Sequence, residues 1–540
     1  IYDNQIYSNP VVREAITGGQ CQIDGMTDYT EAENLAATIR IGSLSLELQE
    51  LRSNVVGAQL GQQAISTSLK AGAIGFAIVA VFMMVLYLIP GVAAVIALAL
   101  YVGLVLIMLT AFDITLTLPG VAGIILSVGM AVDANVIIFT RIKEEIGLGH
   151  SVKSAIKAGF SKALSAILDG NITTLIAAAV LYFRGSGTVK GFASTLAIGI
   201  VLSMFTALFI TKGALYALYA VGFEDPKFYG TKKDGKIINF LGKKNICFIL
   251  SIAVIVAGWA GMALHKGQTG YVLNYGMDFT GGTSTNVTFN EDMSLDDISA
   301  KVVPVVSKIT GDADVQTQKV AGTNEVIIKT KTLDVEQRQQ LEDAMVENFG
   351  VDAEKITAES ISGAVSTEMK KDAVWAVTIA TVLMLLYIWF RFKDIRFAAS
   401  AILALVHDVL VVVTFYSLAK WSVGSTFIAC MLTIVGYSIN ATIVIFDRIR
   451  ENLALKKAGS KQTLEEIVNL SITQTFTRSI NTSLTTFIMV FVLFLLGVSS
   501  IREFALPLMV GIVCGTYSSV CVTGALWYVL TTRKQKKAEK

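Results

Sequence analysis

Residues 121–139, VAGIILSVGMAVDANVIIF, decide the fold of this chain. The stretch is apolar over about 20 residues, which is the length that an α-helix needs to cross a bilayer. Asp133 lies within it. A carboxylate at that depth costs roughly 2.5–3.5 kcal/mol on insertion scales, so such residues are rare and usually mark ion paths or proton relays. The stretch therefore predicts a transmembrane helix that carries a functional acid.

The pattern returns in the second half of the chain. GMAVDANVIIFTRIKEE begins at Gly129 and GYSINATIVIFDRIREN begins at Gly436, about 307 positions later. This register places Asn440 opposite Asp133. The sequence therefore predicts two repeated helical halves, of which only one has kept the intramembrane carboxylate.

Composition supports a membrane protein. Hydrophobic residues make up 53% of the chain, charged residues 16%, and the mean hydropathy is +0.62, whereas soluble domains carry about 25% charged residues. We count eleven apolar runs long enough to span: 69–89, 91–110, 118–140, 163–183, 190–212, 246–264, 372–390, 396–417, 424–446, 478–497 and 504–530.

Positive charge is confined to alternate loops. It clusters after the third and fifth spans, recurs at 391–396 and 448–461, and ends in the tail RKQKKAEK, while FDITLTLP at Phe112 and LAKWSVG at Leu418 are nearly uncharged. The positive-inside rule places the basic loops in the cytoplasm. We therefore expect the segment before residue 67 and the loop 266–371 to face outside.

Few residues suggest a metal or disulfide site. Five cysteines are scattered without framework or ligand spacing, and three histidines form no cluster in the sequence. We expect no cofactor, no metal and no nucleic-acid partner. No signal peptide is recognised at Ile1, and we interpret the sequence as an N-terminally incomplete protein.

Two regions look soluble. In residues 1–66, GGQCQIDG at Gly18 predicts a strand, and DYTEAENLAATIRIG predicts a helix capped by Thr30 and stopped at Gly42. Loop 266–371 predicts the order strand, helix, strand, strand, helix, strand, with Ser294 and Asp297 in capping-box spacing. That order is typical of a ferredoxin-like α+β fold. Neither region shows a catalytic constellation, so we expect no enzyme.

Several long motifs resemble the SecDF family of fused SecD and SecF export subunits. The SecD-like motifs are GGQCQIDG and LPGVAGIILSVGMAVDANVIIFTRIKEE at Leu118. The SecF-like motifs are GMDFTGGT at Gly276, ALVHDVL at Ala404, VGYSINATIVIFDRIREN at Val435 and RSINTSLTT at Arg478. The resemblance implies an RND-like parallel repeat of two helical halves, related by an axis along the membrane normal.

The resemblance also implies a division into segments. We expect a remnant base of the SecD extracytoplasmic domain (1–66), a five-span SecD-like half (67–213), a cytoplasmic linker (214–245), the first SecF-like span (246–265), a ferredoxin-like extracytoplasmic domain (266–371), a five-span SecF-like bundle (372–530) and a basic cytoplasmic tail (531–540).

Function and partners follow from the same resemblance. Members of the family are thought to use the proton motive force, or sodium, to pull an emerging secretory polypeptide outward beside the SecYEG translocon. We therefore expect a multi-pass protein of the bacterial cytoplasmic membrane with a cytoplasmic C-terminus, in contact with lipid and with YajC- or YidC-type partners. The alternatives are an RND-type exporter of small molecules or lipids and a passive scaffold for the translocon.

The resemblance maps the ion relay onto this chain. The family's SecD carboxylate corresponds to Asp133 and its SecF arginine to Arg478, but its SecF carboxylate, in the pattern INDT, is Ala441 here. Either Asp133 works alone or another acid substitutes. Asp408 next to His407 is the expected substitute, because an unperturbed imidazole exchanges protons near neutral pH.

Each candidate has a structural alternative. Asp133 and Asn440 could serve only as hydrogen-bonded packing residues, and His407 with Asp408 could be a polar pair between helices. Arg478 could snorkel to the interface. We expect interfacial or gating roles for Arg141, Asp447 and Arg448. The small residues Gly129, Ala131, Gly436 and Ser438 predict that the two repeat helices approach each other closely. We expect the helices of Asp133 and Asn440 to pack face to face, with Arg478 and Asp408 in the same polar seam.

Overall fold

The computed structural model describes residues 8–13, 16, 18–19, 21–42, 52–56, 58–185, 187–231, 236–312, 315–320, 323–456 and 462–538. The chain forms two compact units, Ile1–Leu51 and Arg52–Lys540.

The first unit contains one helix, α1 (Tyr29–Gly42), among its described residues. The predicted cap, Thr30, is wrong, because Asp28 precedes the helix and its Oδ1 accepts a hydrogen bond from the backbone N of Glu31 at 2.8 Å. The strand predicted in GGQCQIDG is also wrong for residues 21–25, which are exposed and unpaired in sheet; Gln20 lies outside the described residues.

Eleven helical segments among the described residues are long and apolar enough to cross a membrane, as predicted. In chain order they are α2 (Ala58–Tyr87), α3 (Ile89–Ala111), α4 (Leu118–Gly147), α5 (Val152–Arg184), α6 to α7 (Thr188–Ala220), α8 (Lys244–Thr269), α13 (Gly363–Phe392), α14 (Ile395–Leu418), α15 (Ser425–Leu455), α16 (Leu464–Leu496) and α17 to α18 (Ser499–Ala538).

α5 and α16 begin well before the predicted 163 and 478. Their first turns are polar, so hydropathy does not detect them. The start of α16 is nevertheless encoded, because Thr463 and Glu466 form a capping box.

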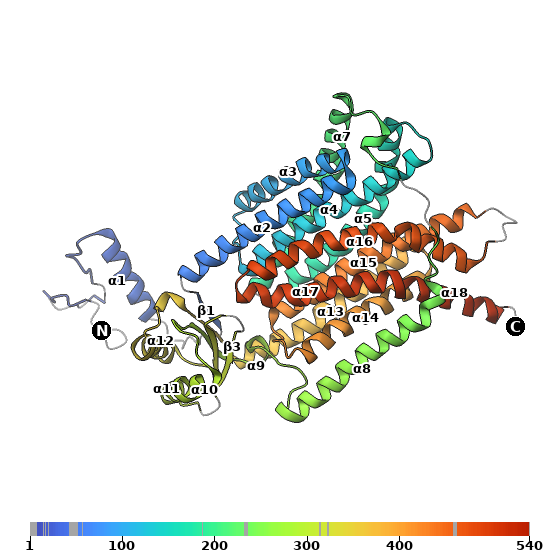
Figure 1. Ribbon diagram of the computed structural model, residues 1–540. Helices are drawn as coiled ribbons and strands as arrows, with labels where there is room; N and C mark the ends of the chain where they lie inside the picture. Colours follow the sequence, from blue (N-terminus) through green and yellow to red (C-terminus); the bar gives the residue numbers. More distant parts are fainter. Residues whose placement is uncertain are drawn as a thin grey trace. The chain divides into compact units, whose positions relative to one another are not determined.

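The helices of the two halves lie side by side in one bundle (Figure 1). α4 packs against α16, and its repeat partner α15 packs against α5. A Cβ added at Gly129 would lie 3.1 Å from the Cα of Thr486, and one added at Gly436 would lie 3.2 Å from the Cα of Thr174. The predicted close approach therefore exists, but it joins α4 to α16 and α15 to α5, and not α4 to α15 as expected.

Matching π-helical turns interrupt the last span of each half, at Thr206–Ile210 and Ser518–Thr523. Each turn bonds to the polar helix of its own half. Thr211, just after the first turn, donates to Oδ1 of Asn135 at 2.9 Å, and Ser519 of the second turn lies 3.3 Å from the Thr442 hydroxyl. Such turns are often retained at functional positions, and here they confirm the repeat in detail.

The soluble part of the second unit is an antiparallel sheet of order β1-β5-β2-β4-β3. Its strands are β1 (Arg52–Val56), β2 (Gly282–Thr288), β3 (Gln316–Lys319), β4 (Glu325–Thr330) and β5 (Ile356–Ile361). The helical turns from α10 (Leu295–Asp297) to α11 (Val303–Thr310) and α12 (Val335–Phe349) bury their apolar side chains against it. The predicted ferredoxin-like order is confirmed, and β1, from the preceding segment, adds a fifth strand beside β5.

The GMDFTGGT motif joins this sheet to the bundle. It forms α9 (Met277–Thr280), followed by Gly281 and Gly282 at positive φ (75° and 118°), a conformation that glycine adopts without strain. Oδ2 of Asp278 accepts a hydrogen bond from the backbone N of Ser425, the first residue of α15, at 2.6 Å. On the neighbouring helix, the Ser499 hydroxyl at the start of α17 donates to the Glu325 carboxylate. We call this end of the bundle the sheet end and the opposite end the basic end.

The glycine contacts predict a position-specific cost. Gly129→Val should lower the thermal unfolding midpoint in detergent, because added methyl groups meet backbone and overpacking costs about 1–3 kcal/mol. Gly103→Val is the matched control, since a Cβ at Gly103 meets nothing within 4 Å. Equal midpoints for the two variants would contradict the close approach.

Candidate functional site

Asp133 projects into the interior of the bundle. Its side chain is buried, at 5% exposure, and its Oδ1 has no hydrogen-bond partner among the described residues. It lines a small cavity in which the centre of a water molecule can occupy about 20 Å³. The other residues that line this cavity are Ile137, Tyr437, Asn440, Ala441, Val444, Arg478, Ser479 and Thr482. This space suffices for about one water molecule. The cavity thus brings an acid and a base from opposite halves to one pocket that has room for a water molecule.

Arg478 reaches the same cavity from α16. It is 6% exposed, and no described group pairs with its Nε. Asp133 and Arg478 line the same cavity without forming an ion pair among the described residues. Leaving a buried charge unpaired is expensive, so this arrangement is one of the least satisfied in the bundle.

The repeat mate of Asp133 borders the same space. Asn440 packs so tightly on α5 that a Cβ at Gly170 would lie 2.0 Å from its Oδ1. Ala441 also lines the cavity, so the position where the family resemblance implies a second carboxylate borders the same space as Asp133.

A second, smaller cavity continues toward the basic end. Arg478 lines it too, with Thr140, Arg141, Glu144, Val444, Arg448, Gln474 and Thr475. Arg478 therefore stands between the Asp133 cavity and the polar residues beyond it.

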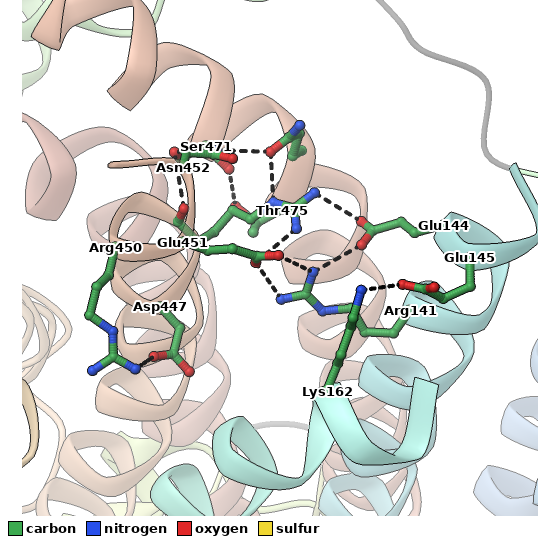
Figure 2. A network of polar contacts seen from close by, with 12 residues as sticks. Arg141, Glu144, Glu145, Lys162, Asp447, Arg450, Glu451, Asn452, Ser471 and Thr475 are labelled. Carbon is green, nitrogen blue, oxygen red and sulfur yellow. Dashed lines mark hydrogen bonds and ion pairs between the residues drawn. The ribbon is translucent and has the colours of Figure 1, made fainter. Parts of the chain in front are cut away.

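Figure 2 shows the ion-pair network around this second cavity. Arg141 of α4 pairs with Glu144 at 3.0 Å and with Glu451 of α15 at 2.8 Å. Arg448 of α15 pairs with Glu451 at 2.9 Å and with Glu144 at 3.5 Å. The predicted gating residues Arg141 and Arg448 are thus brought together, and their network ties the two polar helices at the basic end.

Asp447 belongs to a different cluster. It pairs with Arg450 at 3.0 Å and with Arg391 of α13 at 3.7 Å. Arg391 in turn holds Asp169 of α5, with Nε to Oδ2 at 2.6 Å. Asp169 was missed in the sequence, although it lies inside a span and aligns with Asn481 as Asp133 aligns with Asn440.

His407 and Asp408 form a third cluster, outside the Asp133 cavity. Asp408 is fully buried and accepts hydrogen bonds from Ser438 at 2.5 Å, Ser518 at 2.7 Å and Cys514 at 3.3 Å. Nδ1 of His407 lies 2.9 Å from its Oδ1. A histidine, an aspartate and a cysteine here place potential ligand atoms within 4.8 Å of one another. The sequence did not reveal this cluster, because Cys514 lies far from the other two residues along the chain.

Charged groups also meet at the sheet end. Arg52 of β1 pairs with Glu359 of β5 at 2.8 Å and approaches Asp278 at 3.8 Å. Burial, helped by the nearby Asp278 carboxylate, raises the pKa of Glu359, and burial lowers the pKa of Lys329. Both groups border the junction of the sheet with the membrane helices, where a change in protonation would alter the contact.

Taken together, the fold and the site define a class. Eleven apolar helices, two crossed repeats and a buried acid beside a buried base describe a multi-pass membrane protein of the two-repeat transport type. Side chains of α4, α15 and α16 enclose the polar centre, and a small soluble domain caps one end.

Comparison with known proteins identifies the family. Residues 40–221 and 341–533 both match the family described as protein export membrane protein SecD/SecF, C-terminal, and residues 1–46 match the SecDF P1 head subdomain. The SecDF protein translocase subunit of Bacillus subtilis is 36% identical over 98% of this chain and 73% of its own length. That of Thermus thermophilus is 37% identical over 100% of this chain and 71% of its own length.

Solved structures agree. The crystal structure of SecDF from Thermus, described as a translocon-associated membrane protein, matches 98% of this chain and 71% of its own with a TM-score of 0.81 at 36% identity. A SecDF crystal structure in a super-membrane-facing form matches 99% of this chain and 71% of its own with a TM-score of 0.70 at 35% identity. The chain belongs to the SecDF family.

The cluster of His407, Asp408 and Cys514 allows a test of whether Asp408 substitutes for the carboxylate that is absent at Ala441. Asp408→Asn replaces a carboxylate that accepts several hydrogen bonds, so we expect a loss of about 1–3 kcal/mol in stability. Ion-driven export per folded molecule should fall as well if Asp408 takes part in the relay. Reduced thermal stability with unchanged export per folded molecule would assign Asp408 to packing alone; Asp296→Asn, on the exposed start of α10, is the control.

Proposed function

We propose that this protein assists Sec-pathway protein export and converts a proton or sodium gradient into movement of a polypeptide. It acts in the bacterial cytoplasmic membrane beside SecYEG, with the basic end of the bundle in the cytoplasm, and YajC- or YidC-type proteins are its further membrane partners. Support comes from its family, whose curated members are named protein translocase subunits. The observation that carries the ion-coupled mechanism is the cavity shared by Asp133 and Arg478.

The cavity contains the elements of an ion switch. An arginine close to a carboxylate favours its ionised form, whereas desolvation favours the neutral form. Arg478 lies near Asp133 without pairing with it, so a small movement of the guanidinium changes which form is preferred. Asp133 would take up an ion when Arg478 withdraws and release it when Arg478 returns.

Arg478 also controls access from one side. It lines both the Asp133 cavity and the cavity bordered by Arg141 and Glu144. When the guanidinium moves, the two spaces join, and the ion-pair network at the basic end becomes the last barrier. The network is built of pairs between different helices, so it can exchange partners as the halves move.

The sheet end supplies the mechanical output. Asp278 holds the first turn of α15, the helix that carries Asn440 and Ala441, and Glu325 holds the start of α17. A carboxylate that binds a backbone N–H at a helix N-terminus is a favourable contact. Movement of α15 during ion exchange would therefore be transmitted to the ferredoxin-like domain, where an emerging polypeptide is handled.

Asp133→Asn should abolish gradient-stimulated export in proteoliposomes while thermal stability and membrane insertion stay unchanged. The amide keeps the size of the side chain but cannot exchange a proton, so only the coupling is removed. Asp113→Asn, at an exposed loop position, is the matched control and should retain full activity. Normal stimulation by Asp133→Asn would support the passive scaffold and contradict the proposed motor.

Asp278→Ala should separate ion flux from export. Without the carboxylate, the first turn of α15 loses the hydrogen bond from Ser425 to Asp278 and about 1 kcal/mol of capping free energy. Ion flux through the vesicle membrane should persist while export falls. Asp278→Asn keeps an oxygen acceptor and should retain most export, and an Asp278→Ala protein that exports at the normal rate would disprove the linkage.

A further inference from the structure

The bundle contains two polar seams of matching composition. The first seam, between α2, α4 and α16, holds Asp133, Arg478, Asn481 and Tyr87, with the Asn481 amide donating to the Tyr87 hydroxyl at 3.1 Å. The second seam, between α5, α13 and α15, holds Asp169, Arg391, Tyr387 and Asn440. There the Tyr387 hydroxyl donates to Oδ1 of Asp169 at 2.8 Å.

The repeat relates the acid, the asparagine and the tyrosine of the two seams, with the positions of acid and asparagine exchanged. Asp133 on α4 corresponds to Asn440 on α15, and Asn481 on α16 corresponds to Asp169 on α5. Tyr87 of α2 and Tyr387 of α13 follow similar apolar stretches and occupy corresponding positions in the repeat. Each seam therefore keeps one aspartate, one asparagine, one tyrosine and one arginine, although the arginines come from non-equivalent helices.

We propose that Asp169 is a second ion-exchanging carboxylate, which binds a proton when Arg391 leaves it. The inference rests on the proposed ion-driven function. Asp169 is 5% exposed, and a buried carboxylate that loses its cationic partner is costly to keep. It also lies one residue from Gly170, whose backbone abuts Asn440 in the wall of the Asp133 cavity.

Arg391 has an alternative partner that makes such a cycle feasible. Its guanidinium binds Oδ2 of Asp169 at 2.6 Å and already lies 3.7 Å from Oδ1 of Asp447 on α15. Among the described residues, the charged or titratable groups around Asp169 are Arg391 and Tyr387 of α13 and Asp447 of α15. Asp447 is also bound by Arg450 at 3.0 Å, and Arg141 of α4 acts on it at longer range. A shift of Arg391 to Asp447 would leave Asp169 with Tyr387 and Ser165 only.

The two seams stand in opposite states. Arg391 is bound to Asp169 in the second seam, whereas Asp133 and Arg478 each keep an unpartnered polar atom in the described part of the first seam. One seam therefore has an aspartate paired with its arginine, and the other has an aspartate without such a pair. This is the arrangement expected of two sites that bind an ion in turn. The second site also supplies a carboxylate to a relay in which position 441 is alanine.

The test counts protons and does not depend on export. Purified protein in nanodiscs is titrated with a pH indicator dye from a mildly acidic starting pH, at which a carboxylate held by an arginine is already ionised. The protons released on raising the pH are compared between the intact protein, Asp133→Asn and Asp169→Asn. We expect each variant to release about one proton fewer. Asp169→Asn that releases as many protons as the intact protein would overturn the proposal, because an acid held permanently by Arg391 stays ionised.

A double variant distinguishes proton exchange from structural pairing. Asp169→Asn with Arg391→Gln removes both charges, so it should recover the thermal stability that Asp169→Asn loses. Gradient-stimulated export should stay impaired if Asp169 exchanges protons, and should recover with stability if the pair is structural. Adding Ala441→Asp to the double variant, which returns a carboxylate to the neighbouring cavity, should restore part of the export.

The outcome separates this inference from the function on which it rests. Loss of export in Asp133→Asn with normal export and proton release in Asp169→Asn would leave the export motor intact and reject the second site. Normal export in both variants would reject the ion-driven function itself.

Discussion

Asp133 lies in the interior of an apolar bundle without an ion-pair partner, and much of the surrounding structure can be understood as the means of tolerating it. Insertion of such an acid costs free energy that a purely structural residue would not justify. Arg478 lies close enough to offset part of this cost but does not pair with it. Hydroxyl-bearing residues and space for about one water complete the surroundings. An unpaired carboxylate in these surroundings is the arrangement on which the proposed ion switch rests.

The close helix contacts at two glycines lie on one side of the Asp133 cavity only. Gly129 and Gly436 lie toward the sheet end from Asp133 and Asn440, and there the helix backbones meet too closely for a side chain or a water to intervene. The cavities lined by Arg478 lie toward the basic end. The structure is thus closed at the sheet end by backbone contact and at the basic end only by side chains. Arginine and glutamate side chains can rearrange quickly, whereas separating the backbones requires movement of whole helices.

The sequence was sufficient for the features that depend on local patterns. Hydropathy predicted the eleven spans, and the order of strands and helices predicted the ferredoxin-like domain. The sequence did not predict the features that depend on which helices pack against one another. The repeat suggested that α4 would face α15, but small residues fit against whichever backbone lies opposite, and here α16 and α5 do. Asp408 looked like a neighbour of Asp133 because both are intramembrane acids, yet it faces Ser438, Ser518 and Cys514. Asp169 lacked an obvious motif, and its arginine, Arg391, lies more than two hundred positions away.

α15 is attached to other parts of the protein at both of its ends, so a movement of this helix at the ion site can be transmitted beyond the site. At the sheet end, Asp278 fixes the first turn of the helix, and at the basic end Glu451 and Arg448 tie it to α4. Between these attachments lie Asn440 and Ala441, which face the Asp133 cavity. A change in the charge of that cavity therefore acts on the middle of a helix whose ends are held by two different bodies. The ionic attachment at the basic end joins several charged side chains that can exchange partners, while the attachment at the sheet end is a single hydrogen bond from the backbone of Ser425 to Asp278. Movement that begins at the cavity is consequently expected to appear at the sheet domain, which is the end where an outward pull on a polypeptide would be useful.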